Sequence, residues 1–228
     1  MRTCIYILTI TFLGLLLSQT LRSQQTTVYR PLEPIADKLE PSTIVTYKTV
    51  GDEELGIHIF NPHKHKASDT RAAFVCFHGG GWSGGFPRRF YPFVDHFARL
   101  GLVGISVEYR LLNRDLGTTV FDCVKDARSA IRYIRSHASE LGIDPNKLIV
   151  SGGSAGAHLA AGTALFDGIE EPGDDISIST SPNVMILYYP VIDTSICGYG
   201  NEKIGDRWRE LSPVDNVRGD LPPTLLLH

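Results

Sequence analysis

Residues 149–162 read IVSGGSAGAHLAAG, and this stretch decides the fold. It starts inside an apolar run, residues 147–150, that is typical of a buried strand, and small residues over 155–165 favour a helix. Between them Gly152-Gly153-Ser154-Ala155-Gly156 matches the pattern G-x-S-x-G. In a strand–turn–helix context this pattern predicts a sharp turn with the serine exposed at its tip.

Strand and helix patterns alternate on both sides of this turn. The polar turn GDEE joins two strand patterns at residues 44–50 and 55–60, which predicts a hairpin. Further strands are predicted at 72–77, 102–107, 147–150, 184–189 and 224–227, and helices at 89–100, 118–141 and 155–165. Such alternation indicates an α/β fold with a mostly parallel central sheet and helices on both faces. The aliphatic run 224–227 is predicted to be buried on both faces.

A second glycine-rich turn, FHGGGWSGG at residues 77–85, follows an earlier predicted strand. A loop of the HGGG type donates backbone N–H groups to an oxyanion, and glycine leaves no Cβ between those groups and a substrate. For the small residues around Ser154, close helix–strand packing at the helix start remains an alternative reason. The chain lacks both G-x-x-x-x-G-K-[ST] and G-x-G-x-x-G, so phosphate binding is disfavoured. Two such turns after parallel strands predict one site at the carboxyl edge of the sheet.

These stretches resemble an α/β-hydrolase of the carboxylesterase/lipase superfamily that carries the HGGG loop, as hormone-sensitive-lipase-like enzymes do. More narrowly, the chain is similar to secreted bacterial esterases grouped with acetylxylan and feruloyl esterases. The resemblance runs from about residue 72 to the end and includes FHGGGW, SVEYRL, DCVKDARSAIRYIRSHASELGIDPNKLIVSGGSAGAHLA, YYPVID and LSPVDNV…LPPTLLLH. It implies the α/β-hydrolase fold and ester hydrolysis without a cofactor.

The resemblance also implies roles for individual residues. Ser154 is expected to be the nucleophile, and the backbone N–H groups of Gly80, Gly81 and Ala155 are expected to form the oxyanion hole.

Three neighbours of these residues are expected to shape the glycine-rich loop or line the pocket: His78, Gly79 and Trp82. His78 is expected to hold the loop in shape and not to act as the general base. For Trp82, a place in the acyl or alcohol pocket and simple loop packing are both open.

A serine nucleophile needs a base, usually a histidine that a carboxylate orients. His158 lies one helical turn after Ser154, so we expect it to be structural. Asp193 in YYPVID is interpreted as a strand-end residue that shapes the pocket, with the acid role as the alternative. The resemblance implies that the acid and base follow His228. We therefore expect the chain as given to lack the C-terminal strand and helix of the fold and to be inactive.

The N-terminus has the pattern of a secretory signal. Arg2 precedes an apolar stretch, residues 5–17, and a polar exit, residues 18–20. This predicts a signal peptide at 1–23 and a secreted or periplasmic protein. The apolar centre is shorter than the ~20 residues that a span needs, so no stable membrane insertion is expected. Residues 24–43 are interpreted as a lead-in and 44–228 as the hydrolase domain.

Composition narrows the possible partners. The chain has 228 residues, of which 43% are hydrophobic and 21% charged, with a net charge of −3. These values are typical of a globular protein and give no electrostatic reason to expect nucleic acid as a partner. Cys76 and Cys123 lie in apolar patterns and are expected to be small buried hydrophobes. With Cys197 they leave the disulfide state open, and no pair has metal-ligand spacing, so no metal site is predicted.

The leading functional prediction is a secreted serine carboxylesterase that acts on small-molecule or polysaccharide-linked esters. Acetyl and hydroxycinnamoyl esters are implied by the resemblance alone. An amide or peptide hydrolase, arylformamidase-like or prolyl-peptidase-like, would share the same serine turn. A non-catalytic binding protein would keep the fold without its chemistry, and the intact G-x-S-x-G and HGGG patterns disfavour it.

Overall fold

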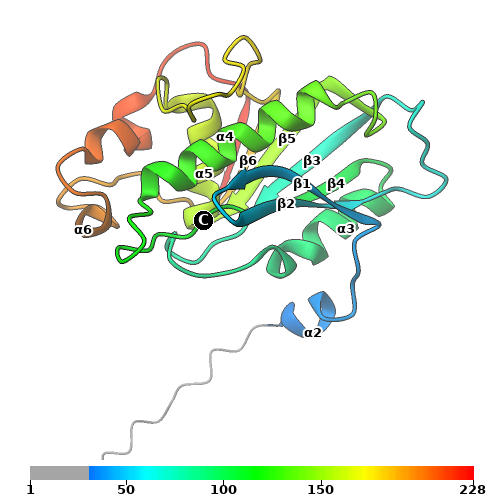
Figure 1. The fold of residues 1–228 in the computed structure, drawn as a ribbon, viewed down its shortest axis with the longest axis horizontal. Coiled ribbons are helices and arrows are strands. Elements are labelled where there is room, and N and C mark those ends of the chain that lie inside the picture. Colours follow the sequence, from blue (N-terminus) through cyan, green and yellow to red (C-terminus); the bar gives the residue numbers. More distant parts are fainter. Residues whose placement is uncertain (1–30) are drawn as a thin grey trace, which may run out of the picture. The chain divides into compact units, whose positions relative to one another are not determined.

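The computed structural model describes residues 31–228, and Leu32–His228 form one compact unit. The predicted signal peptide lies outside the described residues. Within the compact unit a central sheet carries helices on both faces, as Figure 1 shows. The unit begins before the predicted domain boundary at residue 44, because the short helix α2 (Glu33–Ala36) buries Ala36.

Seven strands form the sheet in the order β1-β2-β4-β3-β5-β6-β7. Their bounds are β1 Thr43–Val50, β2 Glu53–Phe60, β3 Arg71–Phe77, β4 Val103–Val107, β5 Ile143–Gly153, β6 Val184–Tyr188 and β7 Thr224–Leu227. The predicted hairpin is confirmed, since β1 pairs antiparallel with β2. β2 is also antiparallel to β4, and the other neighbouring strands are parallel. The mostly parallel sheet is therefore confirmed as well.

Helix α3 (Tyr91–Arg99) covers one face of the sheet, while α4 (Val120–Ser136) and α5 (Ala155–Leu165) cover the other (Figure 1). The side chains of β3 alternate between the two layers, as the pleat of a strand requires. Phe74 and Cys76 pack with Val94 of α3. Val75 and Phe77 belong to the larger core that includes α4 and α5. Each face of the parallel sheet is thus buried, which explains the unbroken apolar runs.

Several predicted elements differ from the structure, among them the predicted strand 147–150, which is the longer β5. The predicted helix 118–141 ends at Ser136, because residues 137–142 form tight turns in which the Glu140 N–H donates to His137 O. Residues 224–227 form a strand, as predicted, but their apolar pattern, typical of a strand buried on both faces, is not matched by burial in the described chain. Leu225 and Leu226 are 51% and 59% exposed, because β7 pairs only with β6 at the edge of the described sheet.

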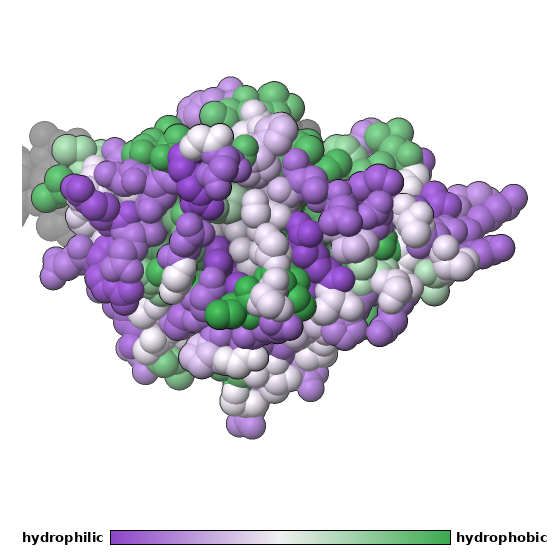
Figure 2. Space-filling view, turned by 90° about the horizontal axis from the view of Figure 1, so that it is seen from above, coloured by the Kyte–Doolittle hydropathy of each residue, from purple (hydrophilic) through white to green (hydrophobic). Residues whose placement is uncertain are grey.

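The segment between β6 and β7 is built from turns and short helices: α6 (Asn201–Ile204) and the 3₁₀ helices η2 (Trp208–Leu211) and η3 (Pro213–Asn216). Another 3₁₀ helix, η1 (Pro87–Phe90), leads into α3. The face seen in Figure 2 is mostly hydrophilic, with hydrophobic residues in separate patches. Over residues 31–228 no helix combines the length and apolar character needed to cross a bilayer.

Candidate active site

Ser154 is the single residue that connects strand β5 to helix α5. β5 ends at Gly153 and α5 begins at Ala155, so the serine turn (residues 152–156) has the predicted strand–turn–helix context. The backbone of Ser154 has φ 55° and ψ −121°, a conformation that costs energy for a residue with a Cβ. Its N–H donates to Tyr188 O at 3.0 Å, and its side chain remains partly exposed. The sequence thus fixes a strained, accessible serine at the edge of the sheet.

The glycine loop (residues 78–85) lies against the serine turn. β3 and β5 are parallel neighbours, and Phe77 pairs with Gly152, so both turns leave the same edge of the sheet. A Cβ added to Gly79 would lie 2.7 Å from Gly153 O and 3.4 Å from the Ser154 Cβ. Only glycine permits this approach. The structure therefore brings the two predicted glycine-rich turns together.

His78 is bonded within the glycine loop. Its Nδ1 lies 3.0 Å from Gly79 O, and because a carbonyl only accepts, Nδ1–H is the donor. This bond orients the peptide that also carries the Gly80 N–H. The next peptide is held by the Ser83 N–H, which donates to Gly80 O at 3.3 Å. Burial lowers the pKa of His78 to about 4, so the imidazole is neutral at pH 7.

Trp82 is fully buried, and its contacts favour loop packing over the pocket position that was also predicted. Its Nε1–H donates to Nδ1 of His158 at 3.3 Å. His158 in turn donates from Nε2 to Leu211 O at 2.7 Å, so both of its ring nitrogens are occupied. Burial lowers the pKa of His158 to about 4. These contacts support the structural interpretation of His158 and leave it no free nitrogen for a proton from Ser154.

An open cavity of about 540 Å³ lies beside Ser154. Its wall comes mainly from the chain after β6 and includes Tyr189, Val191, Ile192, Asp193 and Tyr199. Most of this wall is apolar or aromatic, and Tyr189 is 54% exposed. The cavity provides room for an uncharged organic group next to the serine hydroxyl.

Asp193 lines this cavity, as the pocket-shaping interpretation predicted, but it is not a strand-end residue, because β6 ends at Tyr188 and Asp193 lies in the turns that follow. Its Oδ1 accepts the Ser195 N–H at 2.8 Å, and this backbone bond lowers the pKa of the carboxyl group. Asp193 O also accepts the Tyr199 N–H, at 2.9 Å. The residue therefore fixes the turn that carries Tyr199 into the cavity wall.

Sequence reasoning missed the residues that close over the glycine loop. Lys203 of α6 donates from Nζ to Gly81 O at 3.0 Å, and the ring of Tyr199 lies 5.8 Å from that of Trp82. After YYPVID (residues 188–193), no local pattern marks residues 194–204, since their course depends on contacts with distant segments. Of the three cysteines in the described residues, Cys76 and Cys123 are buried, as predicted, and Cys197 is exposed on the cavity wall. All three are free thiols, which answers the question that the sequence left open.

Comparisons with known proteins agree with this geometry. The family described as BD-FAE matches residues 57–228. A solved structure described as Thermogutta terrifontis esterase 2 phosphoramylated by tabun is 41% identical, with a TM-score of 0.77. The match covers 82% of this chain and 70% of that one.

Two curated relatives match shorter regions. "Probable carboxylic ester hydrolase LipM" of Mycobacterium tuberculosis is 27% identical over 66% of this chain and 38% of its own length. "Endo-1,4-beta-xylanase B" of Butyrivibrio fibrisolvens is 40% identical over 31% of this chain and 12% of its own length. The matched region thus spans well under half of either relative.

Proposed function

Because the chain belongs to the BD-FAE family and has the α/β-hydrolase fold, we propose that it is the hydrolase domain of a serine carboxylesterase. The observation that carries the proposal is the strained Ser154 beside the glycine loop, at the mouth of an open cavity. In the proposed reaction the enzyme cleaves a carboxylic ester through an acyl-enzyme on Ser154.

The first step forms a bond between the Ser154 Oγ and the ester carbonyl carbon, while the hydroxyl proton passes to a general base. The carbonyl oxygen becomes an oxyanion, which the N–H groups of Gly80, Gly81 and Ala155 stabilise. Collapse of the tetrahedral intermediate breaks the bond to the alcohol oxygen, which takes the proton and leaves. Water then attacks the acyl-enzyme, releases the carboxylic acid and restores the serine.

We propose that neither His158 nor His78 is the general base. His158 uses both ring nitrogens in buried hydrogen bonds, and His78 commits Nδ1–H to Gly79 O. His158 therefore has no free ring nitrogen. Burial lowers the pKa of His78 to about 4, which makes it a weak base, and its described contacts are with Gly79 and Tyr109 and not with Ser154. A histidine oriented by a carboxylate, both supplied by another part of the full-length protein, would complete the triad.

The proposed substrate is an ester with an uncharged acyl group, carried by a small molecule or a polysaccharide. The apolar and aromatic wall of the cavity supports the uncharged acyl group. The xylanase among the relatives and the N-terminal signal pattern support export and a polysaccharide ester. Acetyl and hydroxycinnamoyl groups are the acyl groups that we propose first.

The nucleophile is tested by covalent labelling of the full-length protein. Paraoxon should add one phosphoryl group, seen as a mass increase of the intact protein, and abolish hydrolysis of p-nitrophenyl acetate. Ser154→Ala should abolish both labelling and hydrolysis, whereas Ser195→Ala, in the turn beside the cavity, should keep both. Unchanged labelling of Ser154→Ala would show that another residue is the nucleophile.

The reaction class is tested with a substrate panel. We expect kcat/KM for p-nitrophenyl acetate and methyl ferulate to exceed kcat/KM for the amides of the same two acids by roughly 10² or more, because an amine leaves less readily than an alcohol. A preference for the amide would support the alternative, an amide or peptide hydrolase. Full binding of esters with no turnover would support a non-catalytic protein.

A further inference from the structure

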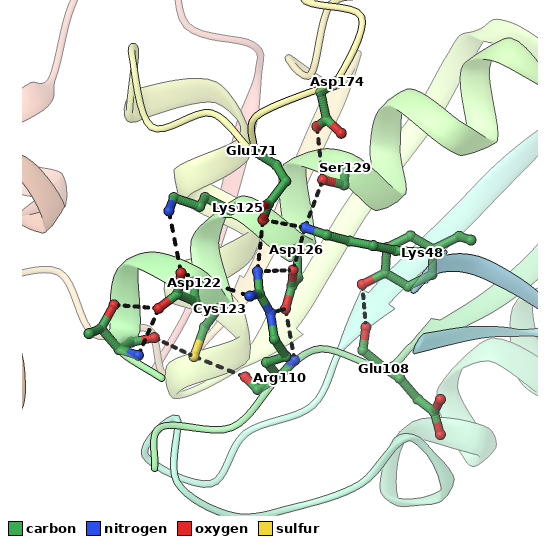
Figure 3. Close-up of polar contacts among 12 residues, drawn as sticks. Lys48, Glu108, Arg110, Asp122, Cys123, Lys125, Asp126, Ser129, Glu171 and Asp174 are labelled. Atoms are coloured by element: carbon green, nitrogen blue, oxygen red, sulfur yellow. Dashed lines mark hydrogen bonds and ion pairs between the residues drawn. The ribbon is translucent and has the colours of Figure 1, made fainter. Parts of the chain in front are cut away.

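Behind the glycine loop, the chain that follows β4 is anchored to α4 by a buried ion pair. Asp126 accepts hydrogen bonds from Arg110 at three atoms: the backbone N–H at 2.9 Å, Nε at 2.8 Å and Nη2 at 2.7 Å. Figure 3 shows the guanidinium of Arg110 facing the carboxylate of Asp126. The fork geometry and the backbone bond together fix the position of residue 110 on α4.

Other charges complete this cluster. Lys48 of β1 contacts both Asp126 and Glu171 at 2.6 Å, and Arg110 contacts Glu171 at 2.8 Å (Figure 3). The side chain of Asp126 has no exposed surface, and those of Lys48 and Arg110 are 10% and 11% exposed. Buried charges of this kind are stable only with their partners in place, so the cluster resists displacement of any one member.

The anchored segment contacts the glycine loop at two positions, residues 78 and 82. Tyr109 donates from its hydroxyl to His78 O at 2.7 Å, and its ring stacks on the His78 imidazole with centroids 4.3 Å apart. Leu112 donates its N–H to Trp82 O at 2.8 Å. Tyr109 and Leu112 lie on either side of Arg110, so the ion pair holds the segment that holds residues 78 and 82.

We propose that Tyr109 is a positioning residue of the oxyanion hole, held in place by the Arg110–Asp126 pair. Its hydroxyl fixes the His78 carbonyl, and its ring fixes the imidazole that orients the peptide bearing the Gly80 N–H. Tyr109 touches no reacting atom and acts only through His78. The inference rests on the proposed esterase function.

The test compares two tyrosines that make the same kind of bond to neighbouring segments. Tyr109→Phe keeps the stacked ring and removes the hydroxyl. Tyr47→Phe is the matched control, because Tyr47 donates its hydroxyl to the backbone carbonyl of Glu108 at 2.8 Å and has no described bond to the glycine loop. Both variants lose one hydroxyl-to-carbonyl bond, and Tyr109→Phe also loses the 3.2 Å contact between the Tyr109 hydroxyl and Nδ1 of His78. The control therefore measures the general cost of losing one such carbonyl bond.

We expect Tyr109→Phe to lower kcat for p-nitrophenyl acetate by roughly 10-fold to 10²-fold with KM within about twofold, since misplaced donors affect the transition state. The paraoxon phosphorylation rate should fall in parallel. Tyr47→Phe should keep kcat within about twofold. Equal losses of kcat in both variants, or a Tyr109→Phe effect confined to KM, would overturn the positioning role.

A second variant keeps the test decisive if Tyr109→Phe does not fold. Arg110→Lys retains a cation beside Asp126 but loses the two-pronged contact, and we expect it to lower kcat by roughly 3-fold to 10-fold with KM unchanged. Unchanged kcat in this variant would overturn the anchoring role of the ion pair. Failure of the esterase proposal is distinguishable from all these outcomes, because the unmutated protein would then show neither turnover nor labelling.

Discussion

Acid should destabilise this protein through two buried histidines. His158 accepts a hydrogen bond at Nδ1 and donates one from Nε2, so a proton added to Nδ1 would face the Trp82 N–H. Burial lowers the pKa values of His158 and His78 to about 4, against about 6.5 in an unfolded chain. Above pH 6.5 both states are neutral and the histidines do not affect stability. As the pH falls from 6.5 through 4, only the unfolded state takes up the proton, so the folded state loses stability.

The linkage relation gives the magnitude of this effect. Between pH 7 and pH 5, a histidine with these two pKa values lowers the free energy of unfolding by about 2 kcal/mol. Two such histidines contribute about 4 kcal/mol, a large part of the stability of an ordinary domain. His158→Gln should therefore halve the histidine contribution, because glutamine does not titrate. At pH 7 this variant should also lose about 1–3 kcal/mol, because an amide does not reproduce the spacing of the two ring nitrogens that bridge the Trp82 N–H and Leu211 O.

Urea unfolding at pH 5, 6 and 7, followed by tryptophan fluorescence, measures both quantities. The loss between pH 7 and pH 5 should be about 2 kcal/mol smaller for His158→Gln than for the unmutated protein. His63→Gln is the control, because His63 is exposed in the loop after β2, and it should match the unmutated protein. If His158→Gln loses as much stability on acidification as the unmutated protein, the buried imidazole is not the acid-sensitive group.

Two glycines give further predictions. Gly156→Ala should lower the free energy of unfolding by about 3 kcal/mol or more, because its Cβ would lie 2.1 Å from Phe77 O. The control is Gly219→Ala, whose Cβ would meet nothing within 4 Å and which should change that free energy by under about 0.5 kcal/mol. Chemical denaturation measures both values. Gly81→Ala should lower kcat by roughly 10²-fold with little change in KM, because its Cβ would meet Lys203 Nζ and the Tyr199 hydroxyl at 2.9 Å and shift an oxyanion donor. Steady-state kinetics measure both constants. A variant that mainly raises KM would show that the loop binds the substrate instead of the transition state.

Local sequence predicted the parts of the fold that depend on local chemistry. Helix α5 has the predicted bounds, because Ser154 ends the strand and the small residues after it pack closely against the sheet. The two glycine-rich turns meet at one edge, as parallel strands require. These features follow from periodicity and from the space that a side chain needs.

Features that depend on distant partners were not predictable. From the sequence, Trp82 could line a pocket or pack in the core. In the structure it is buried and donates its Nε1–H to His158, which is 76 residues away in the chain. Lys203 reaches Gly81 across 122 residues, so no local pattern reveals it as a neighbour of the glycine loop. The apolar sequence of β7 indicates a buried strand, but burial depends on what lies beside it.

The pairing of β3 with β5 also determines at which stage of folding the active site can form. Phe77 pairs with Gly152, so the two halves of the site are 75 positions apart in the chain (152 − 77). Closing a loop of this length costs about 4 kcal/mol of chain entropy beyond a constant, and contacts of such separation form late in folding. A nascent or partly unfolded chain can therefore contain a complete α5 and still hold no oxyanion loop beside Ser154. The site therefore forms only when β3 pairs with β5 in the assembled sheet, and the formation of a single helix is not enough to create it.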